Sequence, residues 1–492
     1  MRDILKGNTM GQPDILLRNV TAVTVDEDRR VIDRAWIAVK GDRIAGLGSE
    51  TDAPPEGARQ VIDGSGMIAM PGLIDSHSHA GHGLVRSAGS GDVDRWFEVC
   101  EEIYARGSTT GFWRAEARLT LLERLQGGVT TAMTLLGGGA DIMRTDDPAF
   151  GDAHCQATIE SGLRTILAVG VGRPPFPRAY RHVGEDGKKR DTPVSFERQL
   201  EVCEELIDRW DGVLDRRTGV SLTMPVYYAK DVAAEADRQY VKQMGDAVMA
   251  LRARKNVLFT QDGHRDGSIA LARDLGVLGP FALLGHSVDL TAADFEALLE
   301  TGASVIHNPS AIMSIYGRCP VPELLDAGIT VCLGSDAAAP DRGYDMFRHM
   351  AQCMHYHRRH FRDPDYLPPG KTLEMATIDA ARALGLEKDL GSLETGKKAD
   401  IVLVDMRKAH LYPPGMPVTR LAHFANASDV DTVIVDGKVL MRGRHIPHLD
   451  IDDILDSAAR EQKQAFERAG MTELWSEPAS YWRSSRRTVE IR

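Results

Sequence analysis

The sequence predicts an α/β protein whose central part is a (β/α)8 TIM-like barrel, and three observations support this prediction. Short apolar runs alternate with helical stretches through the middle of the chain, in about eight units. Both ends of the chain are instead rich in strand-like runs separated by turns. The polar residues best suited to chemistry come at or just after the apolar runs, where barrels carry their active sites.

The expected barrel strands are short and mostly aliphatic. The first begins at Leu73, after the tight turn of Pro71 and Gly72. The later ones are expected at 129–136, 164–171, 220–226, 256–261, 282–284, 304–306 and 330–333. Helical runs separate them, with examples at 195–209, 231–254, 291–301 and 321–327. The terminal strand-like runs are 15–25, 31–39, 43–47, 399–405 and 430–438, and an amphipathic helix is expected at 449–470.

Composition narrows the classes of partner. The chain has 492 residues, 43% of them hydrophobic and 26% charged, with a formal net charge of −12. That charge argues against nucleic-acid and anionic-membrane partners, which require a basic surface. No apolar run reaches the length of a membrane span, and residues 1–12 lack the apolar core of a secretory signal. Six scattered cysteines without Cys-x-x-Cys spacing are typical of reduced thiols, so a cytoplasmic location is expected.

Two histidines follow the first barrel strand. His77 and His79 are two residues apart, so in an extended chain their side chains project to the same side. Paired imidazoles are a natural half of a metal site. Taken alone, such a pair is more often two ordinary surface or core histidines, and the surrounding strand and turn favour the metal.

The stretch Pro71-Gly72-Leu73-Ile74-Asp75-Ser76-His77-Ser78-His79 resembles the first barrel strand of the amidohydrolase superfamily. The chain is most similar to the branch that holds triazine hydrolases and cytosine and guanine deaminases, and the wider group includes molinate and phenylurea hydrolases. The resemblance runs from about residue 15 to about residue 444. It implies that the β-rich ends pack into one small β-sandwich. The expected segments are 1–70 and 395–447 for the sandwich, 71–394 for the barrel and 448–492 for a helical extension.

The resemblance also implies roles for two later strand ends. Asp336 ends the Leu-Gly-Ser-Asp run of the eighth strand, where the family places a metal ligand that takes a proton from the attacking water. A helix N-cap is the alternative for Asp336. His286 ends the sixth strand, where the family histidine touches the metal-bound water or joins the ligands and polarises the substrate. A merely structural strand-end histidine is the alternative there.

The fifth strand departs from the family pattern of a metal histidine followed three residues later by a glutamate. Gln261 stands at the histidine position and His264 at the glutamate position, unless the register slips by one residue. Either Gln261 completes the metal site or His264 supplies the ligand. His264 could also replace the glutamate in proton transfer, because the pKa of histidine is near neutrality. A solvated loop histidine is the alternative for His264.

The remaining candidate residues concern the substrate and the number of metal ions. His307, at the end of the seventh strand, is expected to line the pocket with Tyr228, and His154 and Arg86 lie in segments that could reach it. The fourth strand does not end in the bridging lysine of binuclear relatives, so one divalent ion is expected. Zinc is favoured, with Fe, Mn and Co as alternatives.

Three functions are consistent with these residues. The first is hydrolysis of a C–N bond, or a thiocarbamate C–S bond, in a small amide, urea or carbamate, because the deaminase glutamate is missing. The second is aminohydrolase, deaminase or chlorohydrolase action on a nitrogen heterocycle such as a purine, pterin or triazine. The third is a non-catalytic barrel with a role in assembly. A small-molecule substrate and a homo-oligomer, either a dimer or a tetramer, are expected.

Overall fold

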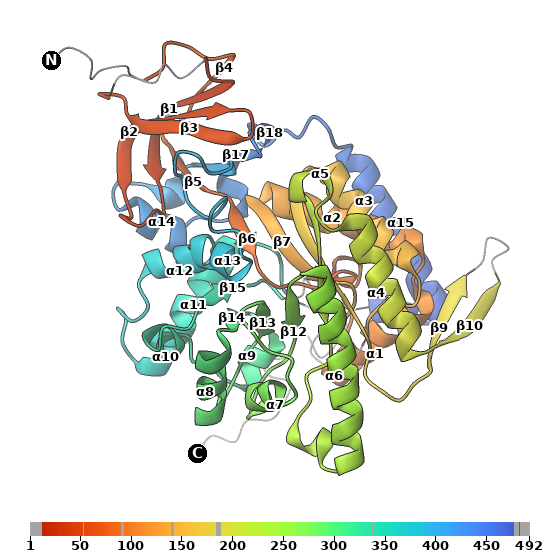
Figure 1. The fold of residues 1–492 in the computed structure, drawn as a ribbon. Coiled ribbons are helices and arrows are strands. Elements are labelled where there is room, and N and C mark those ends of the chain that lie inside the picture. Colours follow the sequence, from red (N-terminus) through yellow and green to blue (C-terminus); the bar gives the residue numbers. More distant parts are fainter. Residues whose placement is uncertain are drawn as a thin grey trace.

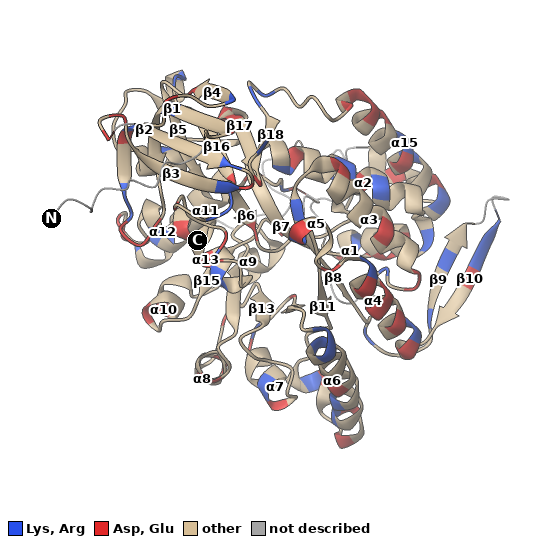
Figure 2. Cartoon of the chain, turned by 45° about the horizontal axis from the view of Figure 1, so that its top comes forward, with Lys and Arg blue, Asp and Glu red and all other residues tan. Residues whose placement is uncertain are grey.

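A computed structural model describes residues 12–52, 54–89, 93–138, 142–183, 188–336, 339, 341–476 and 482. Two β structures lie side by side, a sheet formed by the chain ends and a barrel formed by the middle of the chain (Figure 1). The helices surround the barrel, and Lys, Arg, Asp and Glu are interspersed along outer helices such as α6 and α15 (Figure 2). No helix in the described ranges is both long and apolar enough to cross a membrane.

The barrel confirms the predicted fold class. Its eight strands pair in parallel, in the order in which they follow one another along the chain. They are β6 (Leu73–Asp75), β7 (Val129–Leu135), β8 (Arg164–Gly170), β11 (Thr218–Thr223), β12 (Phe259–Gln261), β13 (Ala282–Gly285), β14 (Ser304–His307) and β15 (Val331–Leu333). Just beyond β6 and β15 the circle closes, because the Ser76 amide donates to Leu333 (3.1 Å) and the Asp336 amide donates to His77 (2.9 Å).

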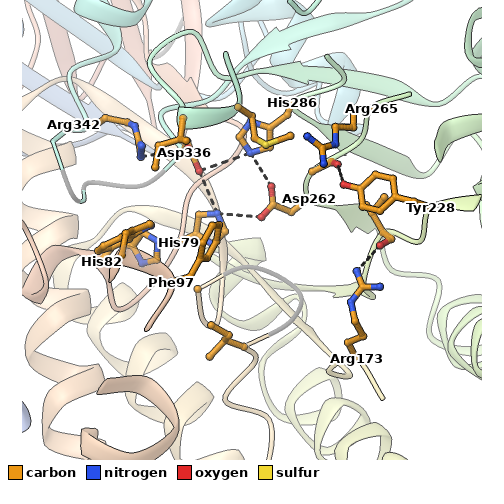
Figure 3. Close-up of a pocket in the computed structure, with 17 residues that line it drawn as sticks. His79, His82, Phe97, Arg173, Tyr228, Asp262, Arg265, His286, Asp336 and Arg342 are labelled. Atoms are coloured by element: carbon orange, nitrogen blue, oxygen red, sulfur yellow. Dashed lines mark hydrogen bonds and ion pairs between the residues drawn. The ribbon is translucent and has the colours of Figure 1, made fainter. Parts of the chain in front are cut away.

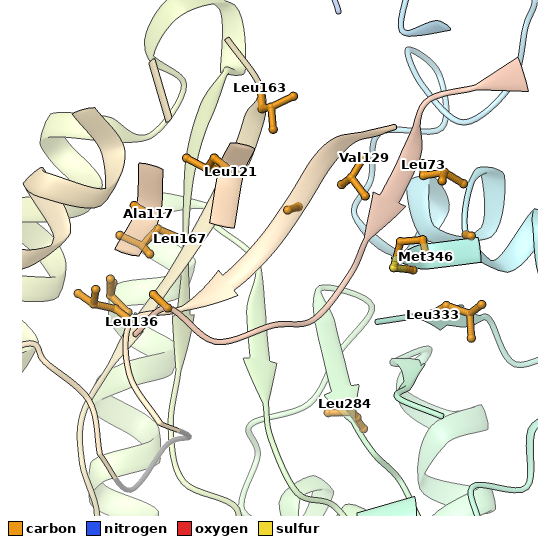
Figure 4. Close-up of a cluster of buried hydrophobic side chains, with 14 of the residues drawn as sticks. Leu73, Ala117, Leu121, Val129, Leu136, Leu163, Leu167, Leu284, Leu333 and Met346 are labelled. Atoms are coloured by element: carbon orange, nitrogen blue, oxygen red, sulfur yellow. The ribbon is translucent and has the colours of Figure 1, made fainter. Parts of the chain in front are cut away.

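Side chains alternate across the barrel wall, as the pleat of a strand requires, apart from an irregularity where β6 and β7 begin to pair. Ile74, Met133, Leu283, Ile306 and Cys332 belong to one buried cluster inside the barrel, which α13 (Ile378–Ala383) closes at one end. Their neighbours along the strands belong to a larger cluster between the wall and the helices, which includes Leu73, Val129, Leu167, Leu284 and Leu333 (Figure 4). The direction of each side chain therefore follows from its position in the strand.

The helices pack their apolar stripes on the outside of this wall. In α4 (Phe196–Trp210) the buried residues are Gln199, Val202, Cys203, Leu206 and Ile207, the spacing of one helical face. The other helices are α1 (Val93–Glu101), α2 (Thr110–Gln126), α3 (Pro148–Ser161), the irregular turn α5 (Val213–Arg216), α6 (Glu235–Lys255), α7 (Ser268–Asp274), α8 (Ala292–Thr301), α9 (Ile312–Tyr316), α10 (Val321–Asp326), α11 (Met346–Phe361), α12 (Pro369–Met375), α14 (Pro417–His423) and α15 (Ile451–Ala469). A hairpin that was not predicted, β9 (Arg178–Val183) and β10 (Lys189–Val194), follows β8.

The second sheet joins the two chain ends, as the resemblance implied. Its order is β18-β17-β16-β5-β1-β2-β3, with β4 beside β1. The strands are β1 (Ile15–Val23), β2 (Val31–Lys40), β3 (Arg43–Ser49), β4 (Gln60–Asp63), β5 (Met67–Pro71), β16 (Ile401–Asp405), β17 (Val430–Val435) and β18 (Lys438–Met441). One residue, Gly72, separates β5 from β6, so this sheet leads directly into the strand that carries His77 and His79. The segment boundaries at 70, 394 and 447 stay predictions.

Candidate metal centre and active site

Five side chains converge at one mouth of the barrel, and each follows the carboxyl end of a strand. His77 and His79 follow β6, Asp262 follows β12, His286 follows β13 and Asp336 follows β15. Figure 3 shows His79, Asp262, His286 and Asp336 at the cavity. The carboxyl ends of parallel barrel strands lie at the same face, which brings residues far apart in the sequence together. All five side chains are at least 85% shielded from solvent, since Asp262, the most exposed, has 14% of its side chain accessible.

The nitrogen and oxygen atoms of these side chains surround a common point. Asp262 Oδ1 lies 2.9 Å from His286 Nε2 and 3.4 Å from His77 Nε2, and Asp262 Oδ2 lies 3.4 Å from His79 Nε2. On the other side, Asp336 Oδ1 lies 3.3 Å from His79 Nε2, 3.8 Å from His77 Nε2 and 4.0 Å from His286 Nε2. Such separations are typical of atoms that share one bound cation.

The donor set fits a divalent metal ion. Imidazole nitrogens and carboxylate oxygens are ligands of zinc and related ions. His79 Nδ1 lies 2.9 Å from the carbonyl of Gly137, so a hydrogen bond there leaves Nε2 with a lone pair for a metal. Both ring nitrogens of His77 are buried without a hydrogen-bond partner among the described residues. Burying an imidazole that makes no hydrogen bond is costly, and a metal ion between His77 Nε2 and the two carboxylates would satisfy it.

The histidines and aspartates of this cluster shift one another's pKa values, because each group lies next to a group of opposite charge. Burial acts to lower the pKa of His79 and His286, but Asp336 beside the first and Asp262 beside the second raise it above the ordinary histidine value. For Asp262 and Asp336, burial acts to raise the pKa. The histidines, with Arg342 beside Asp336, nevertheless keep the pKa of both carboxyl groups below the usual range. Both aspartates are therefore carboxylates, ready to bind a cation.

The backbone is strained where it directs two of these side chains. His286 has φ +67° and Asp336 has φ +65°, the left-handed region that non-glycine residues seldom adopt. Such strain costs of order 1 kcal/mol or more at each residue and persists only where the surroundings impose it. At both positions the chain turns immediately after a barrel strand, and the turn brings the side chain to the mouth.

At the end of strand β12, the residue that reaches the barrel mouth is not the one expected from the sequence. Phe259 belongs to the outer core cluster, so alternation points Gln261 away from the barrel axis as well and Asp262 toward it. The Gln261 amide nitrogen donates to the carbonyl of Pro225 (3.1 Å), and Gln261 is not among the residues that line the cavity. Asp262 takes the place expected of Gln261. Asp262 is not among the residues predicted from the sequence, although the alternation of Leu258, Thr260 and Asp262 about Phe259 indicates that it faces the barrel axis.

His264 also lies away from the cluster. Its side chain is fully buried, and Nδ1 lies 2.9 Å from the hydroxyl of Ser268. Its backbone amide donates to the carbonyl of Gly285 (3.2 Å). Burial lowers the pKa of His264 to about 4, so the ring is neutral at physiological pH. The structure therefore buries the His264 side chain in the loop after β12, neither in solvent nor on the cavity wall.

A buried polar network supports the first and last strands of the site. Asp75, at the end of β6, accepts hydrogen bonds from the amide (2.9 Å) and hydroxyl (2.7 Å) of Ser335. Arg124 of α2 donates to the same carboxylate (3.1 Å) and to the hydroxyl of Ser78 (2.5 Å). Asp75 thus ties the segment carrying His77 and His79 to the segment carrying Asp336.

The residues expected to bind substrate occupy different environments. Tyr228 lines the cavity, and its hydroxyl donates to the carbonyl of Gly263 (2.6 Å). His307 is on the outer face of β14 because Ile306, its neighbour, faces the barrel interior. His154 is buried in α3, and Arg86 forms an ion pair with Glu123 of α2. Of these four, the structure brings only Tyr228 to the cavity wall.

A cavity of about 250 Å³ opens above the cluster. Its wall combines apolar and aromatic side chains with three arginines, and no glutamate lines it within the described part of the chain. The lining residues are His79, His82, Trp96, Phe97, Gly138, Ile142, Arg173, Val226, Tyr228, Asp262, Gly263, Arg265, His286, Ile312, Met313, Asp336 and Arg342. The three arginines were not predicted as site residues, because nothing in the sequence around them indicates that they face a cavity.

The three arginines differ in the contacts that their guanidinium groups make and in how exposed they are. Arg342 lies 3.5 Å from Asp336 Oδ2 and donates to the carbonyls of Ser310 and Ala339 (2.8 Å each). Arg173 donates to the carbonyl of Val226 (2.6 Å). Arg265 lies with its guanidinium 5.4 Å from the centre of the Tyr228 ring, and 42% of its side chain is exposed. Arg265 is therefore the most accessible positive charge at the cavity.

Comparison with known proteins identifies the family. The model of the amidohydrolase family matches residues 68–440. A 5'-deoxyadenosine deaminase of Methanosarcina mazei is 29% identical over 463 residues, covering 92% of this chain and 99% of its own length. A 5-methylthioadenosine/S-adenosylhomocysteine deaminase of Moorella thermoacetica is 32% identical over 453 residues, covering 89% of this chain and 97% of its own length.

Solved structures agree on the fold. A zinc-bound adenosine deaminase of Xanthomonas campestris superposes with a TM-score of 0.79 at 21% identity, covering 93% of this chain and 99% of that one. A zinc complex of atrazine chlorohydrolase from Arthrobacter aurescens gives 0.74 at 24% identity, covering 91% and 100%. The deaminase relatives fit the branch that the resemblance indicated. The chain therefore belongs to the amidohydrolase family and is a hydrolase of carbon–nitrogen bonds other than peptide bonds.

Proposed function

We propose that the protein is a metal-dependent aminohydrolase that displaces an amino group from a carbon of a nitrogen heterocycle. The observation that carries this proposal is the convergence of three imidazoles and two carboxylates beneath the cavity. Relatives that match about nine-tenths of the chain are named as deaminases of adenine nucleosides, which favours a heterocycle over an amide or urea. Trp96, Phe97, Ile312 and Met313 supply apolar wall against which a flat ring would pack.

His77, His79, His286, Asp262 and Asp336 would hold the ion. A divalent ion bound there would supply a water molecule with a pKa lowered toward about 7, and so a nucleophile at neutral pH. In the reaction, water adds to the ring carbon, the C–N bond breaks, and ammonia leaves behind a carbonyl group. We assign the proton transfers to Asp336, which takes the proton of the attacking water and returns it to the departing nitrogen. Arg342, 3.5 Å from Asp336 Oδ2, orients that carboxylate.

Arg265 favours a second candidate function. With Asp262 in the position of the fifth-strand ligand, the residue three positions later is Arg265, where the family pattern has a glutamate. A guanidinium donates hydrogen bonds but cannot accept a proton, so it cannot replace a glutamate that protonates a ring nitrogen. It can stabilise an oxyanion that develops on a carbonyl. Arg265 therefore favours hydrolysis of an amide, urea or carbamate as the alternative.

A paired substrate panel separates the two candidates. Zinc-loaded protein is assayed for ammonia release from adenosine, 5'-deoxyadenosine and methylthioadenosine, and for cleavage of simple amides, ureas, carbamates and thiocarbamates. Ammonia release from the nucleosides supports the proposal, and cleavage confined to the second group supports the alternative. Fully metal-loaded protein that turns over neither group would overturn both.

Two substitutions at one position refine the assignment. Arg265→Glu restores the family carboxylate, and Arg265→Gln removes the charge without adding a proton carrier. If the enzyme deaminates heterocycles, Arg265→Glu should retain more activity than Arg265→Gln. If it cleaves carbonyl substrates through the guanidinium, both variants should lose activity to a similar extent, by about 100-fold or more, as oxyanion-stabilising groups do.

A further inference from the structure

A second group of metal-binding side chains lies on the outer side of the barrel wall, away from the cavity. His307 is the last residue of β14, and alternation along this strand directs its side chain toward the surrounding helices. Cys353 and His357 belong to α11, the helix that follows the Asp336 loop. They are four residues apart, so they share one face of that helix.

The three side chains meet in the space between β14 and α11. One ligand atom from each lies within 4.8 Å of the other two, and the rings of His307 and His357 are 5.4 Å apart. All three residues are fully buried. The described elements thus place a thiol and two imidazoles together in a buried layer between the barrel wall and α11.

The two imidazoles have no hydrogen bonds that would account for their burial. Neither ring nitrogen of His307 or of His357 has a hydrogen-bond partner among the described residues. Tyr356 contacts both rings, and the charges of Arg318 and Glu323, which are paired with each other at 3.0 Å, also act on His357. Leaving a buried polar group unpaired is destabilising, and this layer contains four such nitrogens. A cation is the partner that would satisfy both rings at once.

We propose that Cys353, His307 and His357 form a second metal site, which binds a structural zinc ion. Thiolate and imidazole are ligands that suit zinc, and a water molecule would occupy the fourth tetrahedral position. Binding would release the thiol proton to solvent and involves no change of oxidation state. The ion would fasten α11 to the barrel wall. This site is separate from the centre at the mouth, whose candidate ligands are nitrogen and oxygen atoms only.

Sulfur distinguishes the two sites experimentally. Full-length protein is loaded with zinc, freed of excess metal, and analysed for zinc per chain and by X-ray absorption at the zinc edge. We expect close to two zinc ions per chain and a Zn–S component at about 2.3 Å from one sulfur for every two zinc ions. A fully loaded protein with only nitrogen and oxygen scattering would overturn the proposal. The readout needs no turnover, so it stands or falls independently of the proposed function.

Variants assign the sulfur. Cys353→Ser should remove the Zn–S component and about one zinc per chain, whereas Cys332→Ser, at a buried cysteine inside the barrel, should change neither. His357→Gln leaves the sulfur in place and should lower zinc content in the same way. A Zn–S component that persists in Cys353→Ser would show that another cysteine binds the metal and would refute this site. If Cys353→Ser does not fold, the zinc content of His357→Gln and the Zn–S component of the wild-type spectrum decide whether the site exists.

Discussion

Two groups of buried histidines show how one residue type acquires opposite properties in this protein. His79 and His286 face Asp336 and Asp262 at the barrel mouth, and these carboxylates raise their pKa although burial opposes it. His154 and His264 are equally buried but have no carboxylate against the ring, and burial lowers their pKa to about 3 and about 4. Burial alone therefore does not indicate a functional histidine. The acidic neighbours make the difference.

Removing one of those acidic neighbours should have the largest effect. Asp262→Asn takes away a charge that contacts three histidines. We expect zinc affinity to fall by more than about 100-fold, beyond the loss typical of residues that only support a ligand. Hydrolytic activity at limiting zinc should fall in parallel. Metal titration followed by an activity assay measures both.

The control is Asp266→Asn in the same loop, whose side chain is 68% exposed. This variant should bind zinc like the wild type. An Asp262→Asn protein with unchanged zinc affinity would exclude Asp262 as a ligand and would return attention to Gln261.

The second largest effect is expected in the buried polar network around Asp75, which supports His77 and His79. Arg124→Met leaves the carboxylate of Asp75 buried without its positive partner, which typically costs about 3–5 kcal/mol. Unfolding in denaturant measures the loss. Arg118→Met, on the same helix but with more exposed ion pairs, should cost at most about 1 kcal/mol. Equal losses in the two variants would show that the network adds no special support.

His154, which has no carboxylate against its ring, should make the stability of the protein depend on pH. Because the folded-state pKa of His154 lies below its ordinary value of 6.5, the stability linked to its neutral form is complete above pH 6.5. That stability is lost progressively as the pH falls below 6.5, by about 2 kcal/mol at pH 5. When the pH is lowered from 7 to 5, the free energy of unfolding should therefore fall by about 2 kcal/mol less in His154→Met than in the wild type.

Denaturant unfolding at both pH values tests this expectation, with the exposed His360→Met as the matched control. Identical pH dependence in the wild type and His154→Met would mean that His154 finds a proton acceptor in the folded protein.

The smallest effect is expected at Gln261. Gln261→Met replaces the amide that donates to Pro225 by an apolar side chain of similar length. The lost hydrogen bond should cost about 1 kcal/mol of stability, with zinc affinity unchanged. Measured beside Asp262→Asn, this variant tests whether alternation in β12 places the aspartate, and not the glutamine, at the ion.

The sequence by itself determined the barrel, because eight apolar runs separated by helical runs leave few other ways to bury their surface. It also indicated His77, His79, His286 and Asp336, since each follows an apolar run and matches a strand-end motif of the family that the sequence resembles. The tertiary structure decided which neighbouring residue faces inward. Strands β12 and β14 have only three and four residues, and the direction of their side chains depends on pairing with neighbouring strands. Pairing across the barrel therefore placed Asp262 at the mouth and His307 behind the wall, beside Cys353 and His357.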